Sequence, residues 1–310
     1  MNLTVDELQR DLASYGYIAE KELATTVFLA LKLQKPLLVE GAPGVGKTEI
    51  AKAMAKVLKT NLIRLQCYEG LDENKALYEW NYQKQLLKIQ IMKESVSSEE
   101  IERNLFGEEY LLTRPLLKAI SSKQQEVLLI DEIDKVEAEF EAFLFEVLSD
   151  FQVSIPELGT LKAAHIPVVV LTSNGERELS DGLKRRCVYL YIDYPSIEKE
   201  MHILKIKEPE AGEALRRQIV SAVNYIRHNL HLRKNPSIAE TLDWARAITA
   251  LGYRELTAES FKQTLNIVVK NHDDQEVLQQ EEGIQKILRD TGNPGIKGKL
   301  KPLGQFPSTN

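Results

Sequence analysis

The sequence predicts an α/β protein whose core is a five-stranded parallel sheet, followed by a smaller all-helical domain. As far as about Pro195, apolar and β-branched runs alternate with helical patterns, which favours parallel strands joined by helices. From Ser196 onward the periodicity is helical and strand-like runs stop. A glycine-rich segment at 41–48 directly follows the first strand candidate and leads into a helical pattern, as expected at a strand-to-helix turn of such a sheet.

Each predicted element follows from a local pattern. Helical periodicity at 2–14 and 18–34 precedes the first strand candidate. The strand candidates are nearly continuous in apolar or β-branched residues, as strands buried on both faces tend to be. They are 37–40, 61–66, 126–130, 166–172 and 187–192.

The change of texture after Pro195 predicts the domain boundary. Residues 1–195 are expected to form the α/β domain and 196–290 a helical lid domain. The segment "TGNPGIKGKLKPLGQFPSTN", 291–310, is dense in glycine and proline and is predicted to be a flexible tail without chemistry.

Composition limits the function classes. The 310 residues are 43% hydrophobic and 28% charged, which is ordinary for a water-soluble chain large enough for two domains. A formal net charge of -6 provides no overall basic field, so nucleic acid is an unlikely partner. No segment approaches the roughly 18 uninterrupted apolar residues of a membrane span, and the start "MNLTVDELQR" is polar. The chain is therefore expected in the cytoplasm, without a membrane span.

The two cysteines, Cys67 and Cys187, occur without a CxxC pair or a histidine at metal-ligand spacing. This pattern supports neither a disulfide framework nor a zinc site. Cys187 is predicted to be the buried first residue of the strand at 187–192.

The segment "GAPGVGKT" fits the pattern GxxxxGK(S/T) and has the strand before it and the helix after it that this pattern requires. Glycines let successive backbone N–H groups converge on an anion, and the following helix N-terminus adds partial positive charge. Lys47 would place a charge at the β- and γ-phosphates of a nucleotide, and Thr48 a hydroxyl at Mg²⁺. The predicted ATP contacts are Gly41, Ala42, Pro43, Gly44, Val45, Gly46, Lys47, Thr48 and Glu49.

An acidic pair follows the strand at 126–130, in "EVLLIDEIDK". It lies at the carboxyl end of that strand, the edge where ligands bind in open α/β sheets. Asp131 is predicted to hold Mg²⁺ and Glu132 to polarise an attacking water, which makes hydrolysis the expected reaction. By itself the pair could be a surface acidic turn, but its order after 41–48 favours the site. The third acid, Asp134, is predicted to cap the next helix instead.

Two later segments are less specific. The strand-like "VVVLTSNGE" ends at Asn174, whose amide could hydrogen-bond the γ-phosphate or the lytic water, although such residues are commonly turn formers. "SDGLKRRC", 180–187, places Arg185 and Arg186 where basic side chains commonly meet the last carbonyls of a helix. On the residues alone, this second segment reads as a solvated helix end.

With these motifs in order, the region 18–250 resembles the AAA+ ATPases. "GAPGVGKT" matches their Walker A motif, "LLIDEID" their Walker B motif, and Asn174 their sensor 1. More narrowly, the sequence resembles the MoxR family and its CoxD-like branch. The matching segments are "LQCYEGLDENKALYEWNYQKQLL", "FEAFLFEVLSDFQVSIPELGT", "LKRRCVYLYIDYP" and "PSIAETLDWARA".

The resemblance implies a ring, typically a hexamer, that binds ATP and Mg²⁺ at subunit boundaries. An arginine of one copy would then reach the γ-phosphate bound by its neighbour. Arg186 matches that position best, and Arg185 could pair with the same site or face solvent. A planar guanidinium suits a phosphate better than an ammonium group would.

The family's sensor 2 arginine has no clear counterpart. Near the start of "SIAETLDWARA" its expected position holds Ala239 or Glu240. Arg246 would substitute, or the sensor is absent.

The resemblance also implies two inserts, 67–110 around the second helix and a hairpin at 151–165 before sensor 1. Such inserts commonly form the face that engages a target. Trp80, Tyr78 and Tyr82 are candidate contacts, and packing inside the insert is the alternative for them.

For function, the resemblance implies a chaperone-like ATPase that remodels or matures a protein client, together with a von Willebrand A-domain partner. In the CoxD-like branch, the implied client is a molybdenum hydroxylase. A nucleic-acid motor or loader is one alternative, although the acidic charge balance and the lack of a basic, aromatic-interleaved stripe count against it. A nucleotide-gated scaffold that does not hydrolyse ATP is a second alternative, which the presence of Glu132 and Arg186 disfavours.

Overall fold

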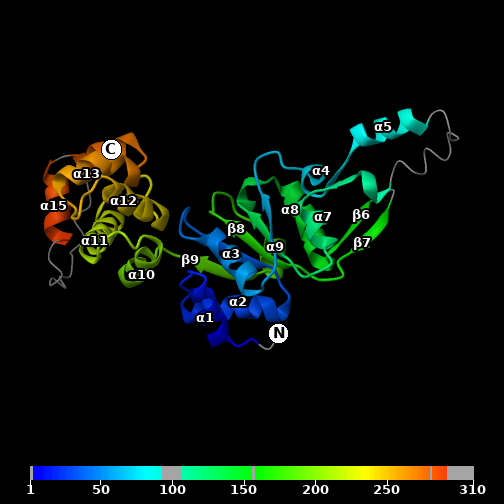
Figure 1. The fold of residues 1–310 in the computed structure, drawn as a ribbon, viewed down its shortest axis with the longest axis horizontal. Coiled ribbons are helices and arrows are strands. Elements are labelled where there is room, and N and C mark those ends of the chain that lie inside the picture. Colours follow the sequence, from blue (N-terminus) through cyan, green and yellow to red (C-terminus); the bar gives the residue numbers. More distant parts are fainter. Residues whose placement is uncertain (1–2, 93–106, 156–157, 280, 292–310) are drawn as a thin grey trace, which may run out of the picture. The chain divides into compact units, whose positions relative to one another are not determined.

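The computed structural model describes residues 3–92, 107–155, 158–279 and 281–291. The chain divides into two compact units, Met1–Pro195 and Ser196–Asn310 (Figure 1). The first contains a parallel sheet, and the second is helical over its described residues. The predicted tail lies outside the described residues from 292 onward.

A five-stranded sheet forms the centre of the first unit. Its order is β2-β5-β8-β1-β9, and every neighbouring pair is parallel. The predicted fold class is therefore confirmed, with strand ends within two residues of those expected. The strands are β1 (Leu37–Gly41), β2 (Leu62–Gln66), β5 (Val127–Asp131), β8 (Val168–Ser173) and β9 (Val188–Ile192).

The prediction that Cys187 starts the last strand is wrong. Cys187 is the C-cap residue of the preceding helix, and its N–H donates to the carbonyl of Lys184. It is half-buried, and β9 begins one residue later.

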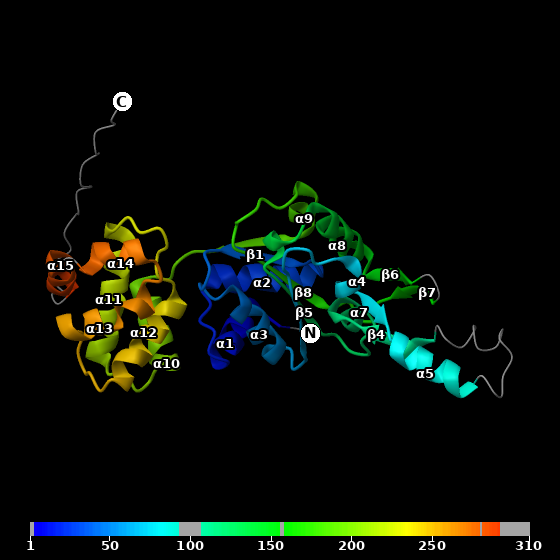
Figure 2. The same cartoon turned by 90° about the horizontal axis from the view of Figure 1, so that it is seen from above.

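Helices cover both faces of this sheet (Figure 2). Successive strand residues point to opposite faces, so Leu37 and Val39 of β1 pack on one side and Leu38 on the other. The first side packs against α1 (Val5–Ser14), α2 (Lys21–Leu33) and α3 (Lys47–Val57). The second packs against α7 (Pro115–Ile120), α8 (Ala138–Asp150) and α9 (Asp181–Arg186). Both faces are therefore closed, and polar residues gather at the carboxyl ends of the strands.

The predicted insert at 67–110 forms short elements beside the sheet. Its strand β3 pairs antiparallel with β4, which follows the insert. Residues 93–106 of the insert lie outside the described residues. The elements are α4 (Glu73–Ala76), β3 (Tyr78–Trp80), α5 (Tyr82–Met92), the 3-10 helix η1 (Glu108–Tyr110) and β4 (Leu111–Thr113).

The insert aromatics divide into two kinds. Trp80 is buried in the core of the first unit, and the ring of Tyr78 meets it edge to face with centroids 6.0 Å apart. Tyr82 is 62% exposed. Packing accounts for Trp80 and Tyr78, and a target contact of the exposed Tyr82 stays a prediction.

Residues 151–165, expected to form a hairpin, contain two antiparallel strands. They are β6 (Gln152–Ile155) and β7 (Gly159–Lys162). Phe151 ends α8 in a left-handed conformation, with φ of 48°, and turns the chain into β6.

The second unit is a helical bundle around Trp244. This side chain is fully buried, meets the ring of Phe261 edge to face at 5.2 Å, and donates from Nε1 to Thr264 Oγ1 at 2.7 Å. A buried ion pair joins Arg227 to Glu200 at 2.7 Å. The helices are α10 (Ile197–Lys207), α11 (Glu213–Asn229), α12 (Ile238–Ala250), α13 (Ala258–Val268), α14 (His272–Gln279) and α15 (Glu281–Thr291).

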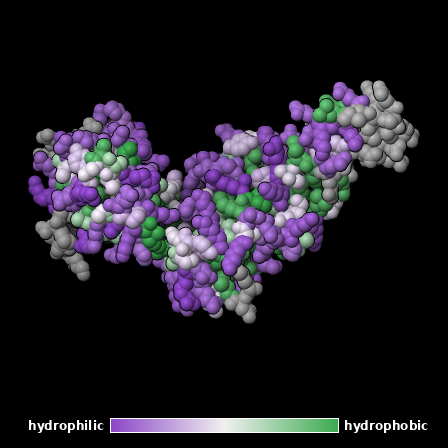
Figure 3. Space-filling model, in the orientation of Figure 1, coloured by the Kyte–Doolittle hydropathy of each residue, from purple (hydrophilic) through white to green (hydrophobic). Residues whose placement is uncertain are grey.

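The surface in Figure 3 is dominated by hydrophilic side chains on both units, with apolar residues gathered in smaller patches. Charged residues make up 28% of the chain and are seldom buried, which accounts for this surface. Across the described parts of the chain, no helix combines the length and the apolar character needed to cross a membrane.

Candidate nucleotide-binding site

The segment 41–48 forms a tight loop between the end of β1 and the start of α3. Gly44 and Gly46 have φ of 76° and 99°, which residues with a Cβ seldom adopt. At Gly41 a Cβ would lie 2.2 Å from the carbonyl oxygen of Ile192, so the loop runs too close to β9 for any side chain. The first N–H groups of α3, which have no intrahelical partner, therefore stand at a loop of bare backbone that can wrap an anion.

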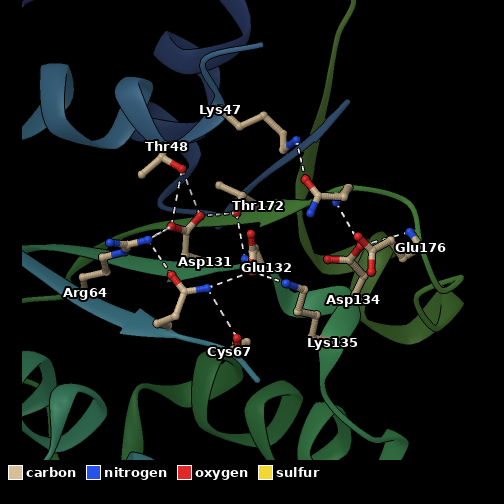
Figure 4. A network of polar contacts seen from close by, with 12 residues as sticks. Lys47, Thr48, Arg64, Cys67, Asp131, Glu132, Asp134, Lys135, Thr172 and Glu176 are labelled. Atoms are coloured by element: carbon tan, nitrogen blue, oxygen red, sulfur yellow. Dashed lines mark hydrogen bonds and ion pairs between the residues drawn. The ribbon is translucent and has the colours of Figure 1, made fainter. Parts of the chain in front are cut away.

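Lys47 is the central cation of this loop and is only 6% exposed. Its Nζ donates to the carbonyl oxygens of Gly41 and Ala42, at 2.6 and 2.8 Å, and to Asn174 Oδ1 at 2.8 Å. Burial lowers the pKa of Lys47, and nearby carboxylates, Asp134 most strongly, oppose that lowering. The predicted cation and the predicted sensor, which are 127 residues apart in sequence, thus meet at one point (Figure 4).

Asp131, the last residue of β5, is 3% exposed, and both of its carboxylate oxygens accept hydrogen bonds. Its Oδ1 accepts from Thr48 Oγ1 at 3.1 Å and from Thr172 Oγ1 at 2.5 Å. Its Oδ2 accepts two bonds from the guanidinium of Arg64, at 3.1 and 2.5 Å. The two predicted Mg²⁺ ligands, Asp131 and Thr48, are therefore in direct contact.

Glu132 has a left-handed backbone, with φ of 60° and ψ of 51°. Such conformations cluster at functional sites and persist only where the surroundings hold them. Here the Glu132 N–H donates to Thr172 Oγ1 at 2.9 Å. The carboxylate accepts from Gln66 Nε2 at 3.0 Å and pairs with Lys135 at 2.7 Å. Because the side chain remains 33% exposed, water can reach it.

Sequence reasoning missed Arg64 and Gln66, which contact the acidic pair from β2. The sequence indicates that these two side chains lie together. In "LIRLQ", Arg64 and Gln66 alternate with apolar residues, which places both polar side chains on one face of the strand. Gln66 is in register with Asp131. The pattern does not reveal that β5 is the neighbour of β2, so the contact itself could not be predicted.

The prediction that Asp134 caps the next helix is wrong. α8 begins at Ala138, with Glu137 at its N-cap position. The 3-10 turn η2 (Ile133–Lys135) intervenes and directs Asp134 toward the end of β8. There its Oδ2 accepts from the backbone N–H groups of Asn174 and Glu176, both at 3.0 Å.

α8 holds the segment that carries the predicted arginine finger. Its buried Glu141 accepts from the N–H of Ser180, the N-cap of α9, and pairs with Arg177, both at 2.7 Å. Burial acts to raise the pKa of Glu141, but these contacts outweigh it and hold that pKa below its usual value. One turn further along α8, the ring of Phe145 lies under Arg186, with the guanidinium carbon 3.8 Å from the ring centroid.

Two other predicted site residues, Arg185 and Glu49, do not direct their side chains to the polar network around Lys47 and Asp131 in any contact that the structure shows. Arg185 is exposed on the last turn of α9. The side chain of Glu49 pairs with Lys52 at 2.7 Å, so its contribution to a nucleotide site would come from its backbone.

The sensor 2 candidates are engaged within the second unit. Arg246 forms ion pairs with Glu208 and with Asp243, the second at 3.5 Å. Glu240 closes a capping box with Ser237 at the start of α12. Both positions are explained by contacts inside the helical unit.

The first unit presents the groups that a magnesium nucleotide needs. The glycine loop and the start of α3 offer backbone N–H donors beside a buried lysine. Asp131 and Thr48 supply the oxygen ligands that Mg²⁺ prefers, already 3.1 Å apart. Glu132 adds an accessible carboxylate at the same edge of the sheet.

These features define a P-loop nucleotide-binding protein. The model of the family described as "ATPase family associated with various cellular activities (AAA)" matches residues 37–193, just over half of the 310 residues. The chain therefore belongs to the AAA family. The matched region includes the glycine loop, the acidic pair, Asn174 and both arginines of α9.

Matches to individual proteins cover more of the chain than residues 37–193. An uncharacterized protein of Staphylococcus aureus (strain USA300) is 26% identical over 244 residues, which cover 74% of this chain and 82% of that protein. One from strain bovine RF122 / ET3-1 is 28% identical over 187 residues, which cover 56% of this chain and 63% of that protein. Two mutants of RuvB from Thermotoga maritima have TM-scores of 0.50 and 0.51, at 17% and 18% identity. These matches cover 91% and 90% of this chain and 80% of each solved chain, and they support the fold.

Proposed function

We propose that this protein hydrolyses ATP with Mg²⁺ and uses the reaction to remodel or mature a protein client, as a MoxR-type AAA+ ATPase. The observation that carries the proposal is the convergence of Lys47, Asn174, Asp131 and Glu132 at one edge of the sheet, from three separate segments (Figure 4). Membership of the AAA family supports the use of a nucleotide.

Each residue has a role in the proposed reaction. The loop N–H groups and Lys47 bind the phosphates, and Mg²⁺ held by Asp131 and Thr48 would neutralise their charge. Glu132 accepts a proton from the water that attacks the γ-phosphorus. The bond from phosphorus to the bridging oxygen then breaks, which leaves ADP and inorganic phosphate. The amide of Asn174 orients the water or the γ-phosphate.

The proposed working form is a ring of copies, a hexamer by resemblance to MoxR proteins. AAA proteins usually oligomerise. Arg186 is exposed, and the phenyl ring of Phe145 supports its guanidinium, which suits a residue that reaches a neighbouring copy. A protein client and a von Willebrand A-domain partner rest on the same resemblance.

ATP turnover by the purified chain tests the proposal. The wild type should release phosphate only with Mg²⁺ present, and turnover per protomer should rise with protein concentration until the ring is assembled. E132Q should slow turnover by about 10²-fold or more, because a general base contributes at least that much, while ATP still binds. E137Q makes the same change at an exposed glutamate and should have no effect.

Two results would count against the proposal. E132Q with the wild-type rate would remove the assigned mechanism. Turnover stimulated by DNA, with a stimulation that falls steeply as salt rises, would favour a nucleic-acid motor instead.

A further inference from the structure

The loop after β8 is held by one buried carboxylate. Gly175 has φ of 75°, which allows the N–H groups on either side of it to point the same way. Those of Asn174 and Glu176 both donate to Asp134 Oδ2 at 3.0 Å. Backbone N–H groups in such a turn form a concavity for an anion, and here the anion is Asp134, which is 4% exposed.

The same loop carries the amide that meets Lys47. Asn174 donates its backbone N–H to Asp134 and accepts from Lys47 Nζ on its side-chain oxygen at 2.8 Å. Asp134 therefore fixes the backbone of Asn174 and, through it, the position of the Asn174 amide. Asp134 thus connects the turn that follows the acidic pair with the loop that carries the predicted sensor.

We propose that Asp134 is a positioning residue, which sets the loop after β8 so that the Asn174 amide faces the bound nucleotide. Its effect on turnover rests on the ATPase function proposed above. Asp134 acts through Asn174 and touches neither phosphate nor water in the reaction.

The hydrogen bonds of Asp134 carry this role, whereas its charge acts separately on Lys47, whose pKa it raises. Oδ2 receives both N–H groups, whereas Oδ1 is buried and has no hydrogen-bond partner among the described residues. In D134N the asparagine keeps the accepting oxygen. Its NH₂ group takes the position of Oδ1, toward which no donor among the described residues points. D134N should therefore hold the loop, and D134A should release it.

Turnover tests the proposal with D134A, D134N and N174A, singly and combined, in the full chain. D134A should slow turnover by up to roughly 10²-fold, as small misplacements near a reacting group do, while the Kd for a fluorescent ATP analogue stays near the wild-type value. D134N should lose less turnover than D134A, because it keeps the accepting oxygen and removes only the charge near Lys47. The D134A/N174A double variant should be no slower than N174A, because the first residue acts through the second.

Amide hydrogen exchange provides a readout that does not depend on activity. The peptide that covers 174–176 should exchange faster in D134A than in the wild type or D134N. Asp274 offers a matched control in the helical unit, since it is also 4% exposed and accepts a backbone N–H, from Arg233 at 3.1 Å. D274A should leave exchange at 174–176 unchanged.

Three results would overturn the inference: equal loss of turnover in D134N and D134A, losses that multiply in the double variant, or unchanged exchange at 174–176 in D134A. A wild type that does not hydrolyse ATP would contradict the proposed function instead. Hydrogen exchange would then still decide whether Asp134 holds the loop.

Discussion

The guanidinium of Arg186 lies over the ring of Phe145, with its central carbon 3.8 Å from the ring centroid. The ring also lies beside Gly182, where a Cβ would be 3.5 Å from it, so it supports α9 along its length. Since an arginine held on an aromatic face keeps its donors pointing outward, less ordering remains when it meets an anion. In the proposed ring of copies, this stacking would prepare Arg186 for its contact with the neighbouring copy.

Replacing Phe145 tests this relationship. F145L keeps an apolar side chain and removes the ring face, so turnover of the assembled ring should fall roughly two- to fivefold, because an exposed cation–π contact contributes about 0.5–1 kcal/mol. In an R186A background the same substitution should have no further effect. Phosphate release at saturating protein concentration measures both.

A second pair of the same kind supplies the control. Lys32 Nζ lies 5.6 Å from the ring centroid of Phe28, on α2. F28L should leave turnover unchanged. An equal loss in F28L and F145L, or a further loss from F145L in the R186A background, would show that Phe145 does not act through Arg186.

Arg64 should weaken Mg²⁺ binding, because its guanidinium occupies Oδ2 of the carboxylate that would hold the metal. R64Q removes the cation, so the Mg²⁺ concentration for half-maximal turnover should fall severalfold, and removing Mg²⁺ with a chelator should still abolish turnover. The effect is limited because the Arg64 side chain is 51% exposed and partly screened by solvent.

The exposed pair of Arg114 and Glu79 provides the comparison for R64Q. R114Q removes a cation of the same kind from an ion pair away from Asp131 and should not change the Mg²⁺ requirement. A higher Mg²⁺ requirement in R64Q would mean that Arg64 supports the metal site rather than competing with it.

The stability of the first unit should fall in acid through Glu126, which is 5% exposed. Burial acts to raise its pKa, but hydrogen bonds from Gln124, Thr60 and Asn61 outweigh it and lower the pKa to about 2. Because the folded pKa lies below the ordinary 4.5, this contribution is complete above that pH and is lost as the pH falls toward 2.

E126Q should therefore reduce the acid dependence of unfolding between pH 4.5 and 2. It should also cost about 1–3 kcal/mol at neutral pH, since an amide NH₂ would face the donors that surround Glu126. Urea unfolding over this pH range measures both effects. E137Q removes an exposed carboxylate, and a change of slope as large as that of E126Q would disprove the assignment.

The sheet strands and the glycine loop could be predicted because each depends on a local sequence pattern. Continuous apolar runs locate buried strands, and the loop pattern places Lys47 and Thr48 at the start of a helix. Both signals need only a short stretch of chain, so no knowledge of the tertiary arrangement is required.

The contacts around the acidic pair could not be predicted in the same way. Arg64 and Asp131 are 67 residues apart and meet only because β2 lies beside β5. Asp134 resembled a helix cap by its spacing, but η2 turns it toward β8. Phe145 fits the amphipathic pattern of α8, and its contact with Arg186 depends on where α9 packs.

The helical unit should depend strongly on the ion pair between Arg227 and Glu200. The side chains are 1% and 0% exposed and share bonds of 2.7 and 2.9 Å, and Thr241 donates to Glu200 at 2.6 Å. E200A would leave the guanidinium buried without its counter-charge, so the unit should lose about 3–5 kcal/mol of unfolding free energy. The fluorescence of Trp244 during urea unfolding should report this loss when it is measured in a W80F background, because Trp80 of the first unit fluoresces as well.

Two further variants separate the ion pair from general packing. The double variant E200L/R227M removes both charges and keeps apolar volume, so it should recover most of the stability lost in E200A, because an apolar pair can replace a buried ion pair at little cost. Glu213 and Arg217 form an exposed pair on α11, with side chains 72% and 57% exposed, so E213A should change stability by less than about 1 kcal/mol. If E200A lost no more than E213A, the buried pair would not be stabilising this unit.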